Sequence, residues 1–331
     1  MKVLVTGSGG FLGSRIVGQL LARRYDVRGF GRSPQPENAA RGVEVVQGDL
    51  GDAYAVDEAV KGCEAVFHVA AKAGVWGDEK SYVTANVTGA RHILAACQEH
   101  GVERLVYTST PSVVFSGEAF EGANESLPLN PHNELSPYAR TKAIAEGELL
   151  AAHGKSGVRI CALRPHLIWG VGDPHLVPRV VAKAKTGRMR IVGGGGNRVD
   201  LTHVDNAAAA HLLALDALNH GVAGGQAYFL SDGEPVVLWD WINDLLRRAG
   251  GGVIEKRISI RAAYLVGSVC EFVWKGFRLS GEPPMTRFVA TELSKSHWFS
   301  IDAARRDLGY RPSVDLSAAL DDVVADLQSA R

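Results

Sequence analysis

The sequence of 331 residues has few cysteines, no excess of either charge and no long apolar run. Its four cysteines, Cys63, Cys97, Cys161 and Cys270, stand far apart and form no CxxC pair, so neither a zinc site nor a disulfide framework is indicated. Lysine plus arginine number 36, as do aspartate plus glutamate, which leaves a formal net charge of zero. The basic surplus that nucleic-acid binding requires is therefore missing, and no nucleic-acid partner is expected.

No targeting or membrane-spanning segment is recognisable either. The chain begins MKVLVT and runs directly into glycines, without the basic, apolar and cleavage regions of a secretory signal, which favours a cytoplasmic protein. The stretch 262–274 places Leu265, Val269 and Phe272 at helical spacing, but Glu271 interrupts it and a bilayer span needs ~20 apolar residues. Three interpretations stay open: a packed core helix, a lid over an apolar substrate, or a membrane-surface contact with Lys275 and Arg278 as basic flanks.

What the sequence does have is an alternation of strand and helix patterns. Short β-rich runs at 2–6, 26–30, 43–47, 65–70, 104–109 and 158–163 are separated by helical patterns. This order predicts an α/β fold with a Rossmann-like, doubly wound parallel sheet covered by helices on both faces. We expect residues 1–165 to form the dinucleotide-binding core, with later core elements interleaved to about residue 235, and residues 166–331 to form mainly a smaller substrate lobe.

Three glycines follow the first strand at a regular spacing. Gly7, Gly10 and Gly13 close that strand and open the first helix. Glycine permits the sharp turn and lets the backbone approach a pyrophosphate, which the free N–H groups of the helix N-terminus can bind. The sequence therefore predicts a dinucleotide site at this loop.

The end of the second predicted strand bears on the choice of cofactor. An acid ~20 residues after the glycines usually binds the ribose 2′-hydroxyl of NAD, whereas a 2′-phosphate calls for arginine. Here the stretch VRGFGRS offers Arg32 and no acid, which favours NADP(H) over NAD(H). Asp49, after the third strand, is either a ligand of the adenine amino group or a plain turn residue.

A tyrosine and a lysine lie one helical turn apart in SPYARTK at 136–142. Ser136 is suited to cap the helix and Pro137 to occupy its first position. Tyr138 and Lys142 then share one face, and the ammonium could stabilise a phenolate that ordinarily forms only near pH ~10. After a dinucleotide fingerprint and a strand ending in Thr108, Ser109 and Thr110, this pair predicts acid–base chemistry.

These motifs together resemble the extended short-chain dehydrogenase/reductase superfamily. LRPHLIWGVGDPHLVPR at 163–179, VDLTHVDNAAAAH at 199–211 and GEPPMTRF at 281–288 are similar to the 3β-hydroxysteroid dehydrogenase family. Within it, AAKAGVWG at 70–77 is most similar to the 2-alkyl-3-oxoalkanoate reductases of bacterial olefin biosynthesis, and the sterol-4α-carboxylate 3-dehydrogenases are close competitors.

The resemblance implies roles for individual residues. Tyr138 would be the proton donor or acceptor, Lys142 its electrostatic partner and ribose ligand, and Thr110 the hydroxyl that contacts the substrate oxygen. Asn86 matches a helix asparagine that holds a water beside the lysine. The expected cofactor-binding residues are Gly7, Gly10, Phe11, Leu12, Gly13, Arg32, Asp49, Leu50, Ala70, Ala71, Lys72, Tyr138, Lys142, Pro165 and His166. The expected substrate contacts are Ser109, Trp76 and His166, and no spacing of histidines supports a metal site.

The expected activity is NADPH-dependent reduction of a bulky apolar 3-oxo compound, most simply a 2-alkyl-3-oxoalkanoate reduced to the 3-hydroxy acid. The first alternative is an oxidative 3β-hydroxysteroid or sterol-4α-carboxylate 3-dehydrogenase, and the second is a nucleotide-binding sensor without catalysis. Both enzymatic activities are compatible with a homodimer, a peripheral membrane contact and partner enzymes of a biosynthetic pathway.

Overall fold

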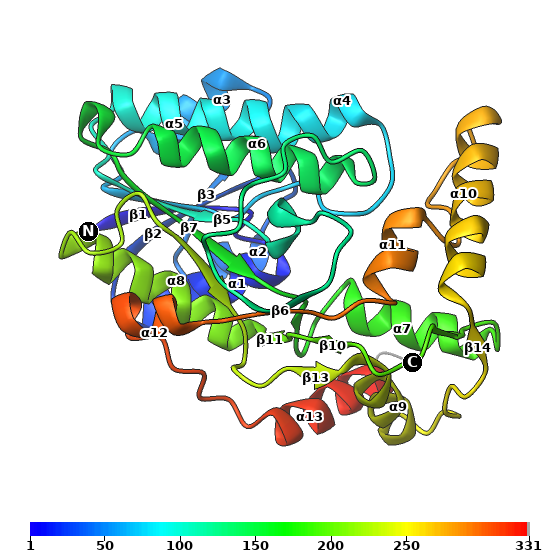
Figure 1. Ribbon diagram of the computed structural model, residues 1–331. Helices are drawn as coiled ribbons and strands as arrows, with labels where there is room; N and C mark the ends of the chain where they lie inside the picture. Colours follow the sequence, from blue (N-terminus) through cyan, green and yellow to red (C-terminus); the bar gives the residue numbers. More distant parts are fainter. Residues whose placement is uncertain (330–331) are drawn as a thin grey trace.

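The centre of the fold is a parallel sheet, seen in a computed structural model that describes residues 1–329. Its strands are β1 (Lys2–Thr6), β2 (Asp26–Gly31), β3 (Glu44–Gln47), β4 (Ala65–His68), β5 (Arg104–Thr108), β7 (Arg159–Pro165) and β12 (Ala227–Leu230). They are ordered β12-β7-β5-β4-β1-β2-β3, and every neighbouring pair is parallel (Figure 1). The predicted fold class is therefore confirmed, and each predicted strand is present within a few residues of its expected bounds.

Helices cover both faces of this sheet. One layer contains α3 (Ala53–Val60), α5 (Gly89–Glu99) and α6 (Pro137–Ala151), and the other contains α1 (Phe11–Ala22), α8 (Val204–Asn219) and α12 (Asp302–Leu308) (Figure 1). The short helix α2 (Pro36–Ala40) lies between β2 and β3, and α4 (Glu79–Tyr82) follows β4. A π-helical segment, Val83–Thr88, links α4 to α5. Because both faces are covered, strand β1 buries Val3, Leu4 and Val5 completely.

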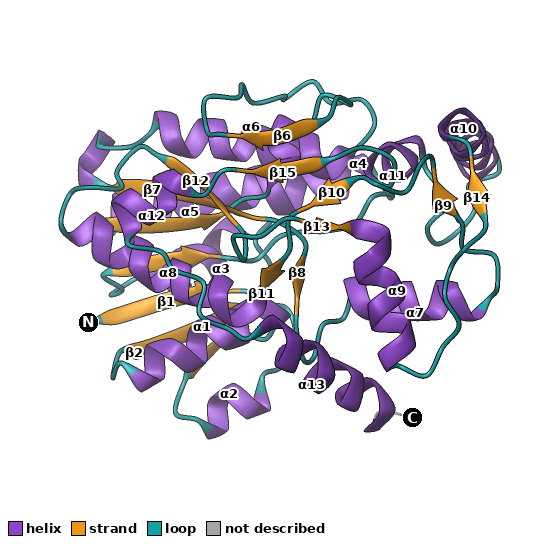
Figure 2. Ribbon diagram, turned by 60° about the horizontal axis from the view of Figure 1, so that its bottom comes forward, coloured by secondary structure: helices purple, strands orange, loops and turns teal. Residues whose placement is uncertain are grey.

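A second lobe of small sheets and helices lies beside the C-terminal ends of the main strands (Figure 2). One sheet has the order β13-β10-β15-β6 and is built from β13 (Val236–Val237), β10 (Arg198–Val199), β15 (His297–Phe299) and β6 (Phe120–Ala123). Two further pairs are β8 (Ile168–Trp169) with β11 (Thr202–His203), and β9 (Ile191–Val192) with β14 (Arg257–Ile258). The lobe's helices are α7 (Leu176–Lys185), α9 (Leu238–Arg248), α10 (Ile260–Gly276), α11 (Arg287–Glu292) and α13 (Leu316–Ser329).

The two lobes are interleaved along the chain. After entering the second lobe, the chain returns to the main sheet with α8 and β12, whereas β6 leaves the first half to pair with β15. The second lobe has its own core, in which Trp169 and Trp239 are each 1 % exposed. The crevice between the lobes is the region that the rest of the fold positions.

Helix α10 stands at the edge of the second lobe, next to α11 (Figures 1 and 2). The interpretation of 262–274 as a packed core helix is wrong for its apolar stripe, because Leu265 is 65 % and Phe272 77 % exposed. None of the residues from 260 to 276 lines the large cavity described below, so the helix does not act as its wall. Among the described residues, no helix has the length and hydropathy needed to cross a membrane.

Candidate active site

The site begins where the strand order of the main sheet reverses, between β1 and β4. Thr6, the last residue of β1, joins the two strand ends: its hydroxyl accepts hydrogen bonds from the backbone of Val69 (3.0 Å) and Ala70 (3.1 Å) and contacts His68 Nδ1 at 2.9 Å. Open α/β sheets bind their ligands at such a switch point. Thr6 thus fixes the two loops that form its rim.

The glycine loop fills this switch point with backbone alone. Gly7 has φ +70°, and a Cβ on it would lie 3.0 Å from the Cα of Ala70. A Cβ on Gly13 would lie 2.1 Å from the carbonyl oxygen of Gly7, so only glycine permits the first turn of α1 to approach the loop. Gly10 caps α1 without a side-chain hydrogen bond, which leaves backbone N–H groups free to bind an anion. The cradle therefore fits the pyrophosphate of a dinucleotide.

A cavity of about 1200 Å³ extends from this loop into the second lobe. Sixteen of the predicted site residues line it: Gly7, Gly10, Phe11, Leu12, Gly13, Arg32, Asp49, Leu50, Ala70, Ala71, Lys72, Ser109, Thr110, Tyr138, Lys142 and Pro165. Its volume exceeds the ~300–1,000 Å³ of ordinary ligand pockets, so it has room for a dinucleotide together with a second molecule. The structure thus brings most of the residues predicted to bind the cofactor and to act in catalysis into one space.

Two charged side chains lie at the nucleotide end of this cavity. Arg32 follows β2, is exposed and forms no ion pair within residues 1–329. Its guanidinium is therefore free to meet a phosphate group. Asp49 accepts a hydrogen bond from the backbone of Gly51 at 2.7 Å, which is the turn contact, while it also lines the cavity.

Tyr138 lies in the first turn of α6. The hydroxyl of Ser136 caps this helix by accepting a hydrogen bond from the backbone of Ala139 at 3.2 Å. Burial raises the pKa of Tyr138 to about 12, although the nearby Thr110 hydroxyl acts in the opposite direction. At neutral pH the side chain is therefore a protonated phenol, the form that can donate a proton.

Lys142 is 2 % exposed and lies one turn further along α6. Its ammonium donates a hydrogen bond of 2.6 Å to the carbonyl oxygen of Thr108 and lies 4.0 Å from the ring centroid of Tyr107. Burial lowers the pKa of Lys142 to about 7, while the nearby carboxylate of Glu146 acts to raise it. The Lys142 ammonium is thus held at the end of β5, beside the cavity that Tyr138 also lines.

Asn86 connects α6, the helix of Tyr138 and Lys142, to the loop after β4. It lies in the π-helical segment, 2 % exposed, and its amide donates to Thr141 Oγ1 at 3.0 Å and to the carbonyl of Lys72 at 3.1 Å. Its Oδ1 accepts a hydrogen bond from the backbone of Lys72 at 2.8 Å. Both amide hydrogens are thus bound to protein, and Asn86 does not line the cavity. The contacts give Asn86 the role of a positioning residue for the loop.

Ser109 supplies a polar atom that the protein itself leaves unpaired. Its side chain is 4 % exposed and lines the cavity, yet its Oγ has no hydrogen-bond partner within the described chain. Buried hydroxyls are normally paired, so this atom is positioned to bind a ligand. Thr110, by contrast, uses its hydroxyl to accept from the backbone of Ser112 at 3.3 Å.

Two predicted contacts lie elsewhere. Trp76 does not line the cavity, although its neighbour Val75 does. The carbonyl oxygen of Trp76 accepts a hydrogen bond from the Tyr82 hydroxyl at 3.1 Å. His166 is also absent from the large cavity, because alternate side chains at the end of β7 point to opposite sides and Pro165 takes the inner one. The structure thus separates Trp76 and His166 from the residues that line the cavity.

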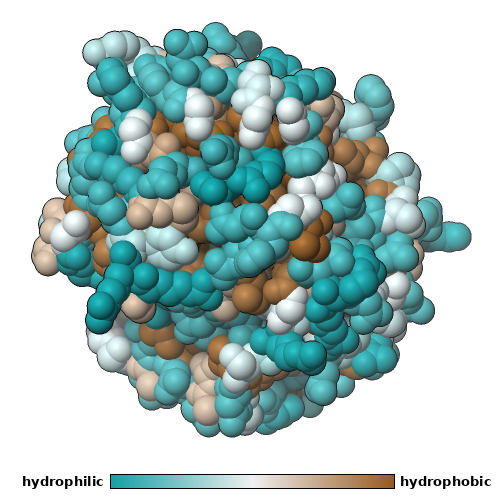
Figure 3. All heavy atoms as spheres, turned by 90° about the vertical axis from the view of Figure 1, so that its left-hand side faces the viewer, coloured by the Kyte–Doolittle hydropathy of each residue, from teal (hydrophilic) through white to brown (hydrophobic). Residues whose placement is uncertain are grey.

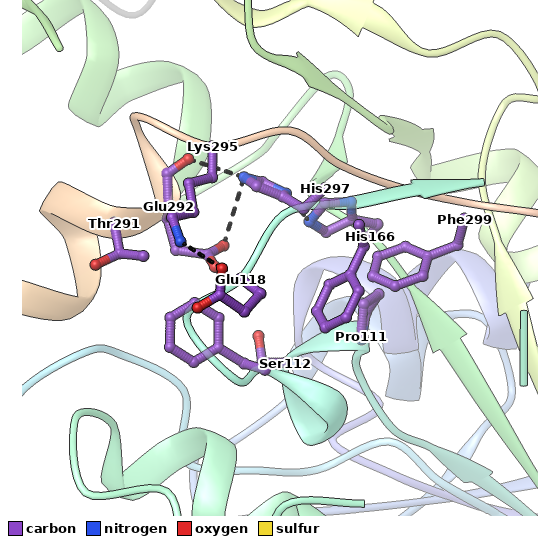
Figure 4. A pocket seen from close by; sticks show the side chains of 11 residues that line it. Pro111, Ser112, Glu118, His166, Thr291, Glu292, Lys295, His297 and Phe299 are labelled. Atoms are coloured by element: carbon purple, nitrogen blue, oxygen red, sulfur yellow. Dashed lines mark hydrogen bonds and ion pairs between the residues drawn. The ribbon is translucent and has the colours of Figure 1, made fainter. Parts of the chain in front are cut away.

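His166 instead lies in a second cavity of about 20 Å³, large enough for about one water molecule (Figure 4). Its Nε2 is 3.2 Å from Nδ1 of His297, whose Nε2 is 2.9 Å from the carbonyl oxygen of Glu292. Burial and the neighbouring imidazole hold the pKa of His166 well below its usual value, so His166 is uncharged at neutral pH. The two imidazoles and the Glu292 carboxylate have ligand atoms within 4.8 Å of one another, an arrangement that could hold a metal ion, and the nearby Lys295 is ion-paired with Glu118 at 3.1 Å (Figure 4).

A buried ion pair joins α6 to β7, and it was not predicted from the sequence. Glu146 on α6 is fully buried and Arg164 on β7 is 3 % exposed, and Arg164 Nε donates to both Glu146 oxygens at 3.1 Å. The guanidinium also stacks 4.9 Å from the ring centroid of Phe229. The only signal in the sequence is a lone acid one turn after Lys142, which does not reveal its partner.

Comparisons with known proteins agree with this geometry. Residues 4–261 match the model of the 3-beta hydroxysteroid dehydrogenase/isomerase family. The chain is 49 % identical to the 2-alkyl-3-oxoalkanoate reductase of Stenotrophomonas maltophilia, over 97 % of both chains. It is 36 % identical to a 3 beta-hydroxysteroid dehydrogenase/Delta 5→4-isomerase of Mycobacterium tuberculosis, over 96 % of this chain and 88 % of that one. The solved structure of a dTDP-glucose 4,6-dehydratase mutant from Streptomyces venezuelae with NAD bound superposes with a TM-score of 0.78 at 25 % identity, over 100 % of this chain and 98 % of that chain.

Proposed function

The chain belongs to the 3-beta hydroxysteroid dehydrogenase/isomerase family, and from this membership we propose that it is an NADPH-dependent ketoreductase of a 2-alkyl-3-oxoalkanoate. The observation that carries the proposal is one cavity that joins the glycine cradle to Thr110, Tyr138 and Lys142. The product would be the 3-hydroxy acid. The 49 % identity with a reductase of that name supports the same substrate class.

The protein's own residues would handle the proton. A bound nicotinamide supplies the hydride that reaches the carbonyl carbon. Tyr138 donates its phenolic proton to the carbonyl oxygen, and its pKa of about 12 keeps it in the donor form at neutral pH. Thr110 and Ser109 orient that oxygen, and the Lys142 ammonium stabilises the negative charge that remains on Tyr138. A protonated phenol is the form of Tyr138 that the reductive direction requires.

The preference for NADPH rests on the free guanidinium of Arg32. β2 is followed by Arg32 and Ser33 instead of an acid that could bind a ribose 2′-hydroxyl, and Arg32 lines the nucleotide end of the cavity. A 2′-phosphate would gain a charge-assisted hydrogen bond there, worth about 1.5–3 kcal/mol. NADH has a 2′-hydroxyl in place of this phosphate and would not gain that contact.

The far part of the cavity is suited to alkyl chains. The second lobe contributes mainly apolar side chains to it: Leu167, Ile168, Leu176, Val180, Met189, Pro283, Pro284, Met285, Phe288, Val289 and Leu293. At ~25 cal/mol per Å² of buried apolar surface, long alkyl substituents would gain much of their binding free energy from these contacts. The same part of the cavity also bears seven polar or charged residues, so apolar side chains outnumber polar ones there without excluding them: Asp173, His175, Arg179, Lys183, Glu282, Thr286 and Glu292.

The family membership also supports a second candidate, an oxidative 3β-hydroxysteroid or sterol-4α-carboxylate 3-dehydrogenase. One assay separates the two: purified protein with NADPH and a long-chain 2-alkyl-3-oxo acid, beside the same protein with NADP⁺ or NAD⁺ and a 3β-hydroxysterol. Oxidation of NADPH in the first pair alone supports the reductase. Turnover in the second pair alone would replace it, and turnover in neither would favour a nucleotide sensor.

A further inference from the structure

Helix α10 exposes a continuous apolar stripe. Leu265, Val269 and Phe272 follow one another at four- and three-residue spacing on one side of the helix and are 65 %, 54 % and 77 % exposed. Phe277, just beyond the helix, is 74 % exposed. Single exposed apolar residues are common, but an aligned series of this exposure marks an interaction surface. Figures 1 and 2 show α10 at the periphery of the molecule.

The opposite side of α10 holds the helix firmly in this orientation. A Cβ on Gly267 would lie 2.7 Å from the backbone of Thr286 and Arg287, so α10 and the start of α11 pack backbone against backbone. Glu271 accepts hydrogen bonds from the backbone nitrogen of Arg287 at 2.6 Å and from its Nε at 2.7 Å. The stripe is therefore a fixed outer face of the α10–α11 pair.

The charges on α10 and its flanks are mainly basic. The chain as a whole has no net charge, but residues 256–281 contain five basic residues and one acid, with Glu255 and Glu282 just beyond them. Glu271 is turned inward to Arg287 and Glu282 pairs with Arg179 at 3.0 Å, whereas Arg261, Lys275 and Arg278 are exposed at the two ends of the stripe. The face on the far side of the molecule differs: Figure 3 shows it as mainly hydrophilic, with apolar areas broken up by polar side chains.

We propose that the α10 stripe docks on the surface of an anionic lipid bilayer. A helix that lies in the membrane interface has this pattern, with a row of large apolar side chains that enters the acyl boundary and basic groups that meet the headgroups. A second copy of the chain fits less well, because either arrangement of two α10 helices face to face brings basic ends against basic ends. The proposal uses only α10 and does not depend on the identity of the substrate.

The position of α10 gives this contact a use in the proposed reaction. The connection from α10 to α11 includes Glu282, Pro283, Pro284 and Met285, which line the large cavity. One short segment thus joins the docking helix to the apolar end of the substrate site. A substrate with long alkyl chains is held in membranes or aggregates, and docking would bring the site to that source.

Co-sedimentation of the full chain with vesicles tests the proposal. Wild-type protein should bind vesicles that contain equal parts phosphatidylglycerol and phosphatidylcholine, and binding should weaken with added salt and on pure phosphatidylcholine. The double variant Leu265→Ser/Phe272→Ser should bind about 100-fold more weakly, at about tenfold for each apolar side chain withdrawn from lipid. Replacing Arg261, Lys275 and Arg278 by glutamine should abolish the preference for the anionic vesicles. Tyr54→Ser, which removes a 75 % exposed aromatic ring at the start of α3, is the matched control and should bind normally.

The outcomes separate this proposal from the proposed function. Turnover of a short, soluble 3-oxo ester with NADPH should be the same in all these variants, because none of the changed residues lines the cavity. Equal vesicle binding by wild type and the double variant would overturn the proposal, as would no binding at all. A dimer in sedimentation velocity that the double variant loses would assign the stripe to a second copy instead. If the wild type did not reduce the ester, that result would count against the reductase assignment and leave the vesicle result unaffected.

Discussion

Replacing Glu146 by glutamine would disturb both the stability of the protein and the charge of Lys142, the lysine of the proposed site. The change leaves the guanidinium of Arg164, 3 % exposed, without its counter-charge. Removing one partner of a buried ion pair typically costs about 3–5 kcal/mol, and the lower figure applies here because a glutamine oxygen still accepts one hydrogen bond. At about 2 °C per kcal/mol for a chain of this size, the melting temperature should fall by about 6 °C.

The second effect concerns Lys142. Its pKa is lowered to about 7 by burial, and the Glu146 carboxylate acts against that lowering. Without the carboxylate the pKa falls further, so the ammonium loses its proton at a lower pH. If the charged lysine supports catalysis, kcat/KM for NADPH should decline as pH rises through about 7 in the wild type and at a lower pH in the variant.

Thermal unfolding and a pH–rate profile from pH 5 to 9 measure the two effects on the same protein. Glu148→Gln is the control on the same helix, since Glu148 forms an exposed pair with Arg91 that contributes little to stability. The double variant Glu146→Leu/Arg164→Met should regain most of the lost stability, because no buried charge is left unpaired. A pH midpoint that stays unchanged or moves upward in Glu146→Gln would refute the reasoning about Lys142.

Three further changes test separate parts of the account. Arg32→Ala should narrow the difference in binding free energy between NADPH and NADH by ~1–3 kcal/mol in fluorescence titrations, and a wild type that prefers NADH would exclude the role of Arg32. Lys142→Met should be more stable than wild type below pH 7. Below that pH the wild type bears the full cost of a buried ammonium. The difference in free energy of unfolding between the two proteins should shrink as pH rises from about 7 to 10.5, the pKa of lysine in the unfolded chain. Denaturant titrations in which the two free energies of unfolding do not converge would contradict the pKa shift. Gly13→Ala should weaken NADPH binding at least tenfold, because the added Cβ would lie 2.1 Å from the Gly7 carbonyl oxygen. Gly18→Ala on α1 is the control: its Cβ would meet only the end of the Arg41 side chain, and this variant should bind NADPH normally.

Local patterns predicted the parts of this molecule that local physics determines. Six of the seven strands of the main sheet were predicted from short apolar runs, with β12 as the exception. The glycine loop follows from a backbone requirement that only glycine satisfies at Gly7 and Gly13. The capped start of α6 at Ser136 is likewise a property of adjacent residues. Each of these features could be predicted without knowledge of what lies across the fold.

Contacts between distant segments could not be predicted in this way. The spacing of Tyr138 and Lys142 shows that they share a face, but not that burial and the Thr108 carbonyl determine the state of the lysine. His166 and His297 are 131 residues apart, and no periodicity links them. For α10 the apolar spacing predicted a helix, but the buried side turned out to be the one with small residues such as Gly267, while the large apolar side chains face outward.

The central claim is that Tyr138 delivers the proton in a reductive reaction within the shared cavity. The most direct test is the turnover of Tyr138→Phe with NADPH and a 2-alkyl-3-oxo acid that the wild type reduces, measured together with the dissociation constant of NADPH. The account predicts that kcat falls by ~10²-fold or more while the dissociation constant and the melting temperature stay near their wild-type values, since only one hydroxyl is lost. A Tyr138→Phe protein that kept near-normal kcat on the same substrate would contradict it.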